Sequence, residues 1–307
     1  MGGSSSGFFS SSHSPEDLAR RTREAEDKIQ DDKFEAEVGE FLASELSQYN
    51  DRDVDDTQNV FDQVKTDLES DIEGTVDLLF GGSIQKHTYV DGLSDVDALV
   101  LVDRSELQDK SPDELKTLLA DALRSRYGHD SVLIGELAVT LTRDDKCIQL
   151  LPALRAGDKF TIASYDGSGW SRIDPKGFAN ALTQANKDAG GKLVPCIKLV
   201  KAIVATLPEQ RRLTGYHTEA LAIQVFKAYE GPKTSKAMVR HFFEHASEHV
   251  KQPIKDSSGQ SIHVDEYLGS EGSLQRRIVS DALGRLSRRI KNADGARSVA
   301  GWKELFE

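Results

Sequence analysis

The sequence predicts an α/β protein with a mixed sheet in its first half and a lobe of helices in its second half. Between residues 76 and 154 the apolar residues fall in short runs, and Val96 to Val102 is the nearly continuous apolar run of a central strand. After about residue 175 they recur every three to four positions, which is the helical period. With 307 residues and 38% hydrophobic content, the chain is long enough for one large domain or two moderate ones.

These patterns divide the chain into three parts. Residues 1–14 are expected to be a disordered serine-rich tail, because they lack the basic region and apolar core of a signal peptide. Residues 15–175 are expected to hold the sheet and the helices before it, and 176–307 the helical lobe. In the second part we expect helices over 15–32, 34–46 and 60–72, strands over 76–80 and 96–102, a helix capped by Ser111, and a hairpin of strands over 132–141 and 146–154. In the third part we expect helices over 193–207, 216–228, 236–250 and 273–291.

Composition narrows the class of protein. The net charge of −12 argues against a chain that coats nucleic acid, because such binding depends on clustered lysines and arginines. No run approaches the roughly 20 apolar residues that cross a bilayer, so we expect no membrane partner. Cys147 and Cys196 match no metal-binding spacing, and we expect buried thiols in a reducing cytoplasm.

The stretch from Phe80 to Asp103 is the part of the sequence that most clearly indicates a functional site. Gly82 and Ser83 follow an apolar run, and a helix start after such a turn offers backbone N–H groups to a phosphate. Asp95 and Asp97 stand two residues apart at the start of the next strand, and side chains at that spacing share a face. Two carboxylates beside a glycine turn predict a site for Mg²⁺ that carries a nucleoside triphosphate.

The full constellation, GGS-x-x-x-x-T-x-x-x-x-x-SDVDALV, resembles the site of the polymerase-beta-like nucleotidyltransferase superfamily. Within it, the chain from about residue 34 to 290 is similar to bacterial relatives of cyclic GMP-AMP synthase and oligoadenylate synthase, the CD-NTases (DncV-like proteins) of antiphage CBASS systems. The likeness also rests on LLPALRAG at 150–157, GYHTEALA at 215–222 and PIKDSSG at 253–259. It implies a mixed sheet and a helical lobe with the active-site cleft between them.

The resemblance also implies an activity. It predicts a cytoplasmic enzyme that joins nucleoside triphosphates, ATP among them, into a cyclic di- or oligonucleotide second messenger and releases pyrophosphate. Two Mg²⁺ ions, with Mn²⁺ as the alternative, would be held by the catalytic residues Asp95 and Asp97. The predicted partners are a downstream effector that binds the product and a regulatory protein.

The resemblance assigns further residues in the helical lobe. Lys198 and Lys201 lie three apart on one helix, and Lys201 is the preferred triphosphate contact, against the alternative of two solvated lysines. Tyr216 falls at a tyrosine that stacks on a nucleobase, with a core tyrosine as the alternative. Gly215 replaces the serine that precedes that tyrosine in the family.

One position departs from the family pattern. The third metal-binding acid is expected three residues before a proline, where this chain has Gln149. An amide coordinates a metal only weakly and adds no negative charge. Two alternatives to a cyclase therefore stay open: a nucleotide-binding homologue that is weakly active or needs an activating partner, and a transferase that modifies RNA or protein. Glu136, Asp144 and Asp145 are possible substitute acids, of which the last two are expected in a hairpin turn.

Two features of the helical lobe have ordinary explanations. His241, His245 and His249 recur every four residues, but Phe242 and Phe243 mark the buried side and no acid completes a site, so we expect a solvated face. Arginines and a lysine over 276–291 alternate with apolar residues, which favours an amphipathic surface helix over a triphosphate contact.

Overall fold

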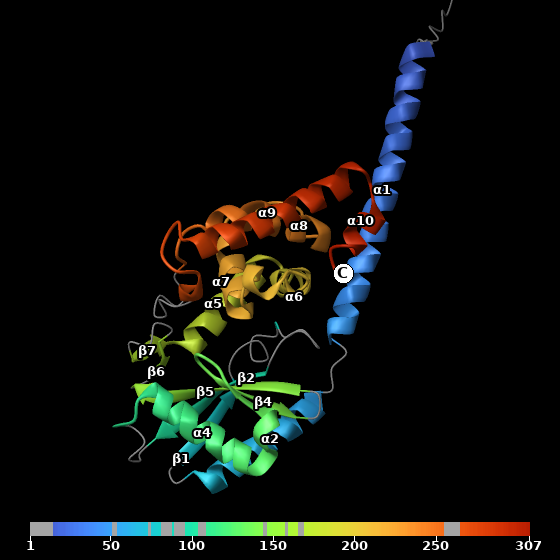
Figure 1. The fold of residues 1–307 in the computed structure, drawn as a ribbon. Coiled ribbons are helices and arrows are strands. Elements are labelled where there is room, and N and C mark those ends of the chain that lie inside the picture. The colour runs from blue at the N-terminus through green and yellow to red at the C-terminus, as the bar shows by residue number, and fades with distance from the viewer. Residues whose placement is uncertain are drawn as a thin grey trace, which may run out of the picture.

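The computed structural model has a mixed sheet and a lobe of helices (Figure 1). It describes residues 15–50, 54–72, 75–80, 88, 96–103, 109–143, 146–156, 159–164, 169–254 and 265–307. None of the helices in these ranges is long and apolar enough to cross a membrane.

The described strands form one sheet of seven strands. Its main path runs β1-β2-β5-β4-β3, and β6 pairs with both β5 and β7. β2 and β5 are parallel, whereas the other pairs are antiparallel. The strands are β1 (Thr75–Phe80), β2 (Val96–Asp103), β3 (Val132–Ile134), β4 (Val139–Arg143), β5 (Lys146–Ala156), β6 (Lys159–Ala163) and β7 (Trp170–Ile173). The predicted α/β class is therefore confirmed.

The longer helices form two groups. α2 and α4 pack against the sheet, and their apolar faces share one core with β1, β2, β4 and β5. The helical lobe comprises α5 to α10, which follow the last strand and share a second core with α1. The helices are α1 (Pro15–Asn50), α2 (Val54–Asp71), α4 (Pro112–Tyr127), α5 (Pro175–Asp188), α6 (Leu193–Ala205), α7 (Gly215–Val225), α8 (Ser235–His249), α9 (Leu274–Gly295) and α10 (Val299–Lys303).

The caps explain where several helices begin. Ser111 accepts a hydrogen bond from the backbone of Glu114, whose carboxylate accepts one from the backbone of Ser111 at 2.8 Å. This reciprocal pair satisfies two N–H groups that have no partner inside the helix. Asp174, Thr214 and Ser273 cap α5, α7 and α9. Each accepts one backbone N–H with its side chain, without the reciprocal bond seen at α4.

Three predicted elements differ from the structure. The two helices expected over 15–46 are one helix, because the polar stretch Asp31-Asp32-Lys33 contains neither Gly nor Pro to stop it. The strand expected over 132–141 is β3 and β4, since the Gly135 N–H bonds to the Ala138 carbonyl at 2.8 Å and closes a turn. The strands β6 and β7, which lie between residue 154 and the helical lobe, were not predicted.

Two side-chain predictions also need correction. Cys196 is buried and free as expected, but Cys147 is exposed. Arg276, predicted on a surface helix, is 1% exposed and pairs with buried Asp265 at 2.7 Å. Its guanidinium also donates to the carbonyls of Val250 and Gln252, so it fixes the segment before α9. The other arginines of α9, Arg277, Arg285, Arg288 and Arg289, are exposed.

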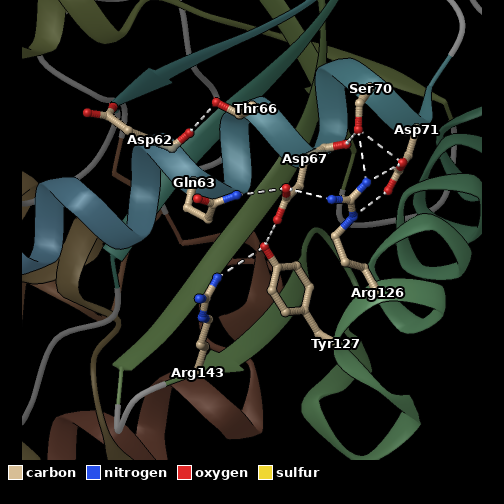
Figure 2. A network of polar contacts seen from close by, with 9 residues as sticks. All are labelled: Asp62, Gln63, Thr66, Asp67, Ser70, Asp71, Arg126, Tyr127 and Arg143. Carbon is tan, nitrogen blue, oxygen red and sulfur yellow. Dashed lines mark hydrogen bonds and ion pairs between the residues drawn. The ribbon is translucent and has the colours of Figure 1, made fainter.

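A polar network fastens α2 to α4 and β4 (Figure 2). The carboxylate of Asp67, which is 6% exposed, accepts hydrogen bonds from Gln63, Arg126 and the hydroxyl of Tyr127. Arg126 also binds Asp71, at 2.6 Å, and Arg143 of β4 donates to the Tyr127 hydroxyl at 3.3 Å. Burial and the bond to Asp67 raise the pKa of Tyr127 to about 12. The network thus holds the helix before β1 against the helix after β2.

Tyr127→Phe tests this network. Removal of a donor to a buried carboxylate is expected to lower the free energy of unfolding by about 1.5–3 kcal/mol. Tyr229→Phe is the matched control, because the Tyr229 hydroxyl donates to the exposed carbonyl of Pro232, and it is expected to cost about 1 kcal/mol or less. Urea denaturation of both variants gives the comparison, and equal losses would contradict a special role for Asp67.

Candidate active site

The candidate site begins where β1 ends and β2 starts. Phe80, the last residue of β1, is the register partner of Ala98 in β2. The two ends of the segment 81–95 are therefore held together at one end of the sheet. Gly82, Ser83 and Asp95 belong to this segment and lie outside the described residues, as does the side chain of Asp97. Their predicted roles stay predictions.

The backbone of Asp97 lies beside that of Gln149. In the parallel pairing of β2 with β5, Asp97 and Gln149 are register partners, and Thr140 of β4 is the partner of Gln149 on its other side. Gln149 is half-buried. Position 149, to which the resemblance assigns the third metal-binding residue, thus neighbours Asp97 in the sheet, and its role as a ligand stays a prediction.

The three acids considered as substitutes for the third metal ligand do not take the place of Gln149 in the sheet. Glu136 is exposed in the turn between β3 and β4, and its carbonyl accepts a hydrogen bond from Lys116 at 2.6 Å. It is not on β5, the strand that neighbours β2 on this side. Asp144 and Asp145 lie outside the described residues. Of the four candidates for the third position, Gln149 is the one whose backbone is paired with Asp97.

Lys201 of α6 takes part in a buried ion pair. Its ammonium lies 2.7 Å from Oε1 of Glu219 on α7, and the two side chains are 8% and 1% exposed. The same ammonium donates to the carbonyl of Thr88 at 3.0 Å, and the Thr88 hydroxyl donates to Glu219. Thr88, which is fully buried, is the threonine of the GGS-x-x-x-x-T stretch. Lys201 of α6 and Glu219 of α7 therefore hold Thr88, and we call these three residues the clamp. Thr88 belongs to the same segment as Gly82 and Ser83.

Within the described part of the chain, Lys201 keeps one donor for another ligand. A lysine ammonium has three N–H groups, and the contacts to Glu219 and Thr88 use two of them. Lys198, one turn earlier on α6, is also buried. The alternative of two solvated lysines is therefore wrong, while the triphosphate contact stays a prediction for both.

Tyr216 lies in the first turn of α7, close to the clamp. It is half-buried, and its ring packs against that of Phe178 on α5, with ring centroids 4.6 Å apart and a tilt of 49°. At the preceding residue, a Cβ on Gly215 would lie 3.5 Å from Nζ of Lys201, which is ordinary van der Waals contact. The position of the family's serine thus adjoins Lys201.

A buried histidine fixes the start of α7 next to Tyr216. His217 is fully buried, and its Nδ1 lies 2.8 Å from the hydroxyl of Tyr267, which also accepts the N–H of Thr214 at 3.1 Å. Burial lowers the pKa of His217 to about 4. His217 is therefore neutral at neutral pH, so α7 starts without an added charge beside Lys201.

Two residues of the site were not assigned a role from the sequence, namely Thr88 and Glu219. Both stand inside stretches that carry the family resemblance, 81–100 and 215–222. The signal that could have found them is the apolar character of α6. A lysine on such a helix is buried and needs a carboxylate nearby. The sequence alone did not say which acid that was.

Comparison with known proteins adds a likeness of fold. No protein-family model matches the sequence, and no curated protein matches it significantly. Solved structures do match. The 3'-deoxy GTP bound form of DncV from Escherichia coli has a TM-score of 0.63 at 14% identity, over 91% of this chain and 90% of that one.

Two more solved structures match the fold of this chain. The CD-NTase CdnG of Bradyrhizobium diazoefficiens in complex with GTP has a TM-score of 0.62 at 16% identity, over 80% of this chain and 88% of that one. DncV cyclic AMP-GMP synthase of Vibrio cholerae, solved with nonhydrolyzable GTP, has a TM-score of 0.59 at 12% identity, over 94% of this chain and 90% of that one. The chain therefore has the α+β nucleotidyltransferase fold of the CD-NTases.

Proposed function

We propose that this chain is a nucleotidyltransferase that joins nucleoside triphosphates into a cyclic di- or oligonucleotide and releases pyrophosphate. The observation that carries the proposal is the pairing of Asp97 with Gln149 on parallel neighbouring strands, within a CD-NTase fold that extends over most of the chain. The name of one neighbour, a cyclic AMP-GMP synthase, favours a cyclic product over transfer to RNA or protein. A separate effector protein would bind that product, as expected for antiphage signalling.

The chemistry of the donor atoms fits a divalent metal. Asp95 and Asp97 supply carboxylate oxygens and Gln149 an amide carbonyl, and hard cations such as Mg²⁺ or Mn²⁺ prefer oxygen ligands. When bound, such ions neutralise phosphate charge and activate an attacking hydroxyl. With an amide at position 149, the set carries two negative charges in place of three. We infer that the site binds its metal more weakly than a site with three acids.

The residues of the helical lobe have positioning tasks in this proposal. Lys201, through Thr88, holds the segment with Gly82 and Ser83, which would bind the phosphates of the donor nucleotide. Tyr216 would offer a ring to a nucleobase. Lys201 would act through Thr88, and the variants of Lys201 and Glu219 decide whether its third N–H also contacts a phosphate oxygen. Held in this way, a ribose hydroxyl of one nucleotide attacks the α-phosphorus of another, and pyrophosphate leaves. A second, intramolecular attack closes the ring.

Incubation with nucleotides tests the activity. Purified chain with labelled ATP, GTP, CTP and UTP and either Mg²⁺ or Mn²⁺ is expected to release pyrophosphate and to form a product that resists phosphatase, because a cyclic product has no terminal phosphate. Asp97→Asn is expected to lower the rate at least about 100-fold. Labelled RNA or protein in place of a resistant product, or equal product from Asp97→Asn, would contradict the proposal.

Gln149→Asp tests the charge at the third position. An added carboxylate beside Asp97 is expected to lower the Mg²⁺ concentration for half-maximal rate about tenfold, since metal affinity follows the number of ligand charges. Gln149→Ala, as control, is expected to raise that concentration. Lower activity of Gln149→Asp with an unchanged metal requirement would mean that the amide is fitted to the site and the charge is not limiting.

The clamp at Thr88 is tested by a double-mutant cycle. Glu219→Gln and Lys201→Met each break the buried pair and are expected to raise the KM for nucleotide by similar factors, because both release Thr88. The double variant is expected to be little worse than either one. A much larger effect of Lys201→Met on KM, added in full to that of Glu219→Gln, would assign Lys201 a triphosphate contact independent of the clamp.

A further inference from the structure

One turn of α8 gathers three side chains that could hold a metal ion. His241, Glu244 and His245 each offer one ligand atom, and these atoms lie within 4.8 Å of one another. From the sequence we expected no acid near the histidines, and this was wrong, because Glu244 lies between them on the same face. His249, one turn further on, is exposed. Phe242 and Phe243 are fully buried, as expected.

The backbone fixes the tautomers of both histidines. Nε2 of His241 lies 3.3 Å from the carbonyl of Val225, and Nδ1 of His245 lies 2.9 Å from the carbonyl of His241. A carbonyl oxygen only accepts, so each of these nitrogens carries the proton. Nδ1 of His241 and Nε2 of His245 therefore keep the lone pairs. Metal-binding histidines in proteins are commonly oriented by such a second hydrogen bond to a carbonyl.

His241 is half-buried on α8. Its ring is held between aromatic neighbours, with centroids 4.4 Å from Tyr229 and 5.3 Å from Phe226. The first ligand is therefore preoriented before any metal binds.

Glu244 has two cationic neighbours, and a bound metal would share its carboxylate with them. Arg240 lies 3.0 Å and Lys291 3.6 Å from Oε1 of Glu244, which leaves Oε2 as the oxygen for a metal. Arg240 also pairs with Asp294 at 3.2 Å, so it keeps a partner when Glu244 turns.

We propose that His241, Glu244 and His245 bind a zinc ion on the surface of the helical lobe. Two imidazole nitrogens and one carboxylate oxygen form a donor set that zinc takes readily, with water as the fourth ligand. Ligand atoms on a tetrahedral zinc are about 3.4 Å apart, given bonds of about 2.0–2.1 Å. Rotation of the exposed His245 and of Glu244 toward His241 would close the remaining gap.

The bound zinc would stabilise one turn of α8, because its three protein ligands all belong to that helix. His241 contacts the carbonyl of Val225 at the end of α7 and the rings of Phe226 and Tyr229 beyond it. A metal that immobilises His241 therefore ties the middle of α8 to the end of α7. Because zinc binds the folded form, it is expected to raise the melting temperature.

Zinc titration of the full chain is the test. Competition with a chromophoric chelator, with millimolar Mg²⁺ present to occupy the Asp95 and Asp97 site, is expected to show one equivalent of bound zinc. His245→Ala and Glu244→Gln are each expected to weaken binding by at least about tenfold and to reduce the zinc-dependent rise in melting temperature. His249→Ala is the matched control, one turn away on the same helix, and is expected to bind as the unaltered chain does.

Several outcomes would overturn the proposal. The absence of zinc binding at micromolar concentration would exclude the site. A loss of zinc affinity in His249→Ala equal to that in His245→Ala would assign the site to the pair His245 and His249. An unchanged zinc affinity in Glu244→Gln would remove the carboxylate from the ligand set. Unchanged binding in His245→Ala would point to another ligand, such as the exposed Cys147. Melting temperatures without zinc show whether each variant folds.

Discussion

The parallel pairing of β2 with β5 is the constraint on which the rest of this structure depends. From Ala98 to Val102 every residue of β2 is buried, and both faces of the strand are covered. A shift of one residue between the two strands would misplace the side chains that pack on both faces of β2, and close-packed cores do not tolerate such a change. The apolar residues thus fix the register, and the register sets which residue neighbours Asp97. Packing in the core decides the geometry of the polar site at its end.

The pair of Lys201 and Glu219 joins this sheet region to the helical lobe. Two buried charges lose much hydration, and their mutual attraction compensates for it only when the geometry and the added hydrogen bonds are good. Here Thr88 provides the added bonds through both its carbonyl and its hydroxyl. The same contact that satisfies the charges therefore also fixes a point in the segment between β1 and β2. The satisfaction of two buried charges and the position of Thr88 thus depend on one cluster.

The sequence predicted the elements whose signals are local. Ser111 with Glu114 marked the start of α4, and the apolar run from Val96 marked β2, because caps and strand periods depend on neighbours in the chain. The resemblance assigned Gln149 to the third metal-binding position, which stays a prediction, and the register that sets it beside Asp97 appears only in the folded sheet. The partner of Lys201 and the burial of Arg276 were missed, because Glu219 and Asp265 approach them only in the folded chain. Glu244 was also missed, although it stands three residues after His241 and such a spacing places both on one helix face.

The packing of α1 has a consequence for how the chain folds during synthesis. Phe34, Val38 and Leu42 of this helix are buried against α6 and α8, which lie more than 150 residues further along the sequence. The core around β2, β5, α2 and α4 is built from residues 60–150 and has all its members as soon as that stretch has left the ribosome. The apolar side of α1 stays uncovered until α6 and α8 have been synthesised. This interval is when a nascent chain is most exposed to aggregation and to chaperones.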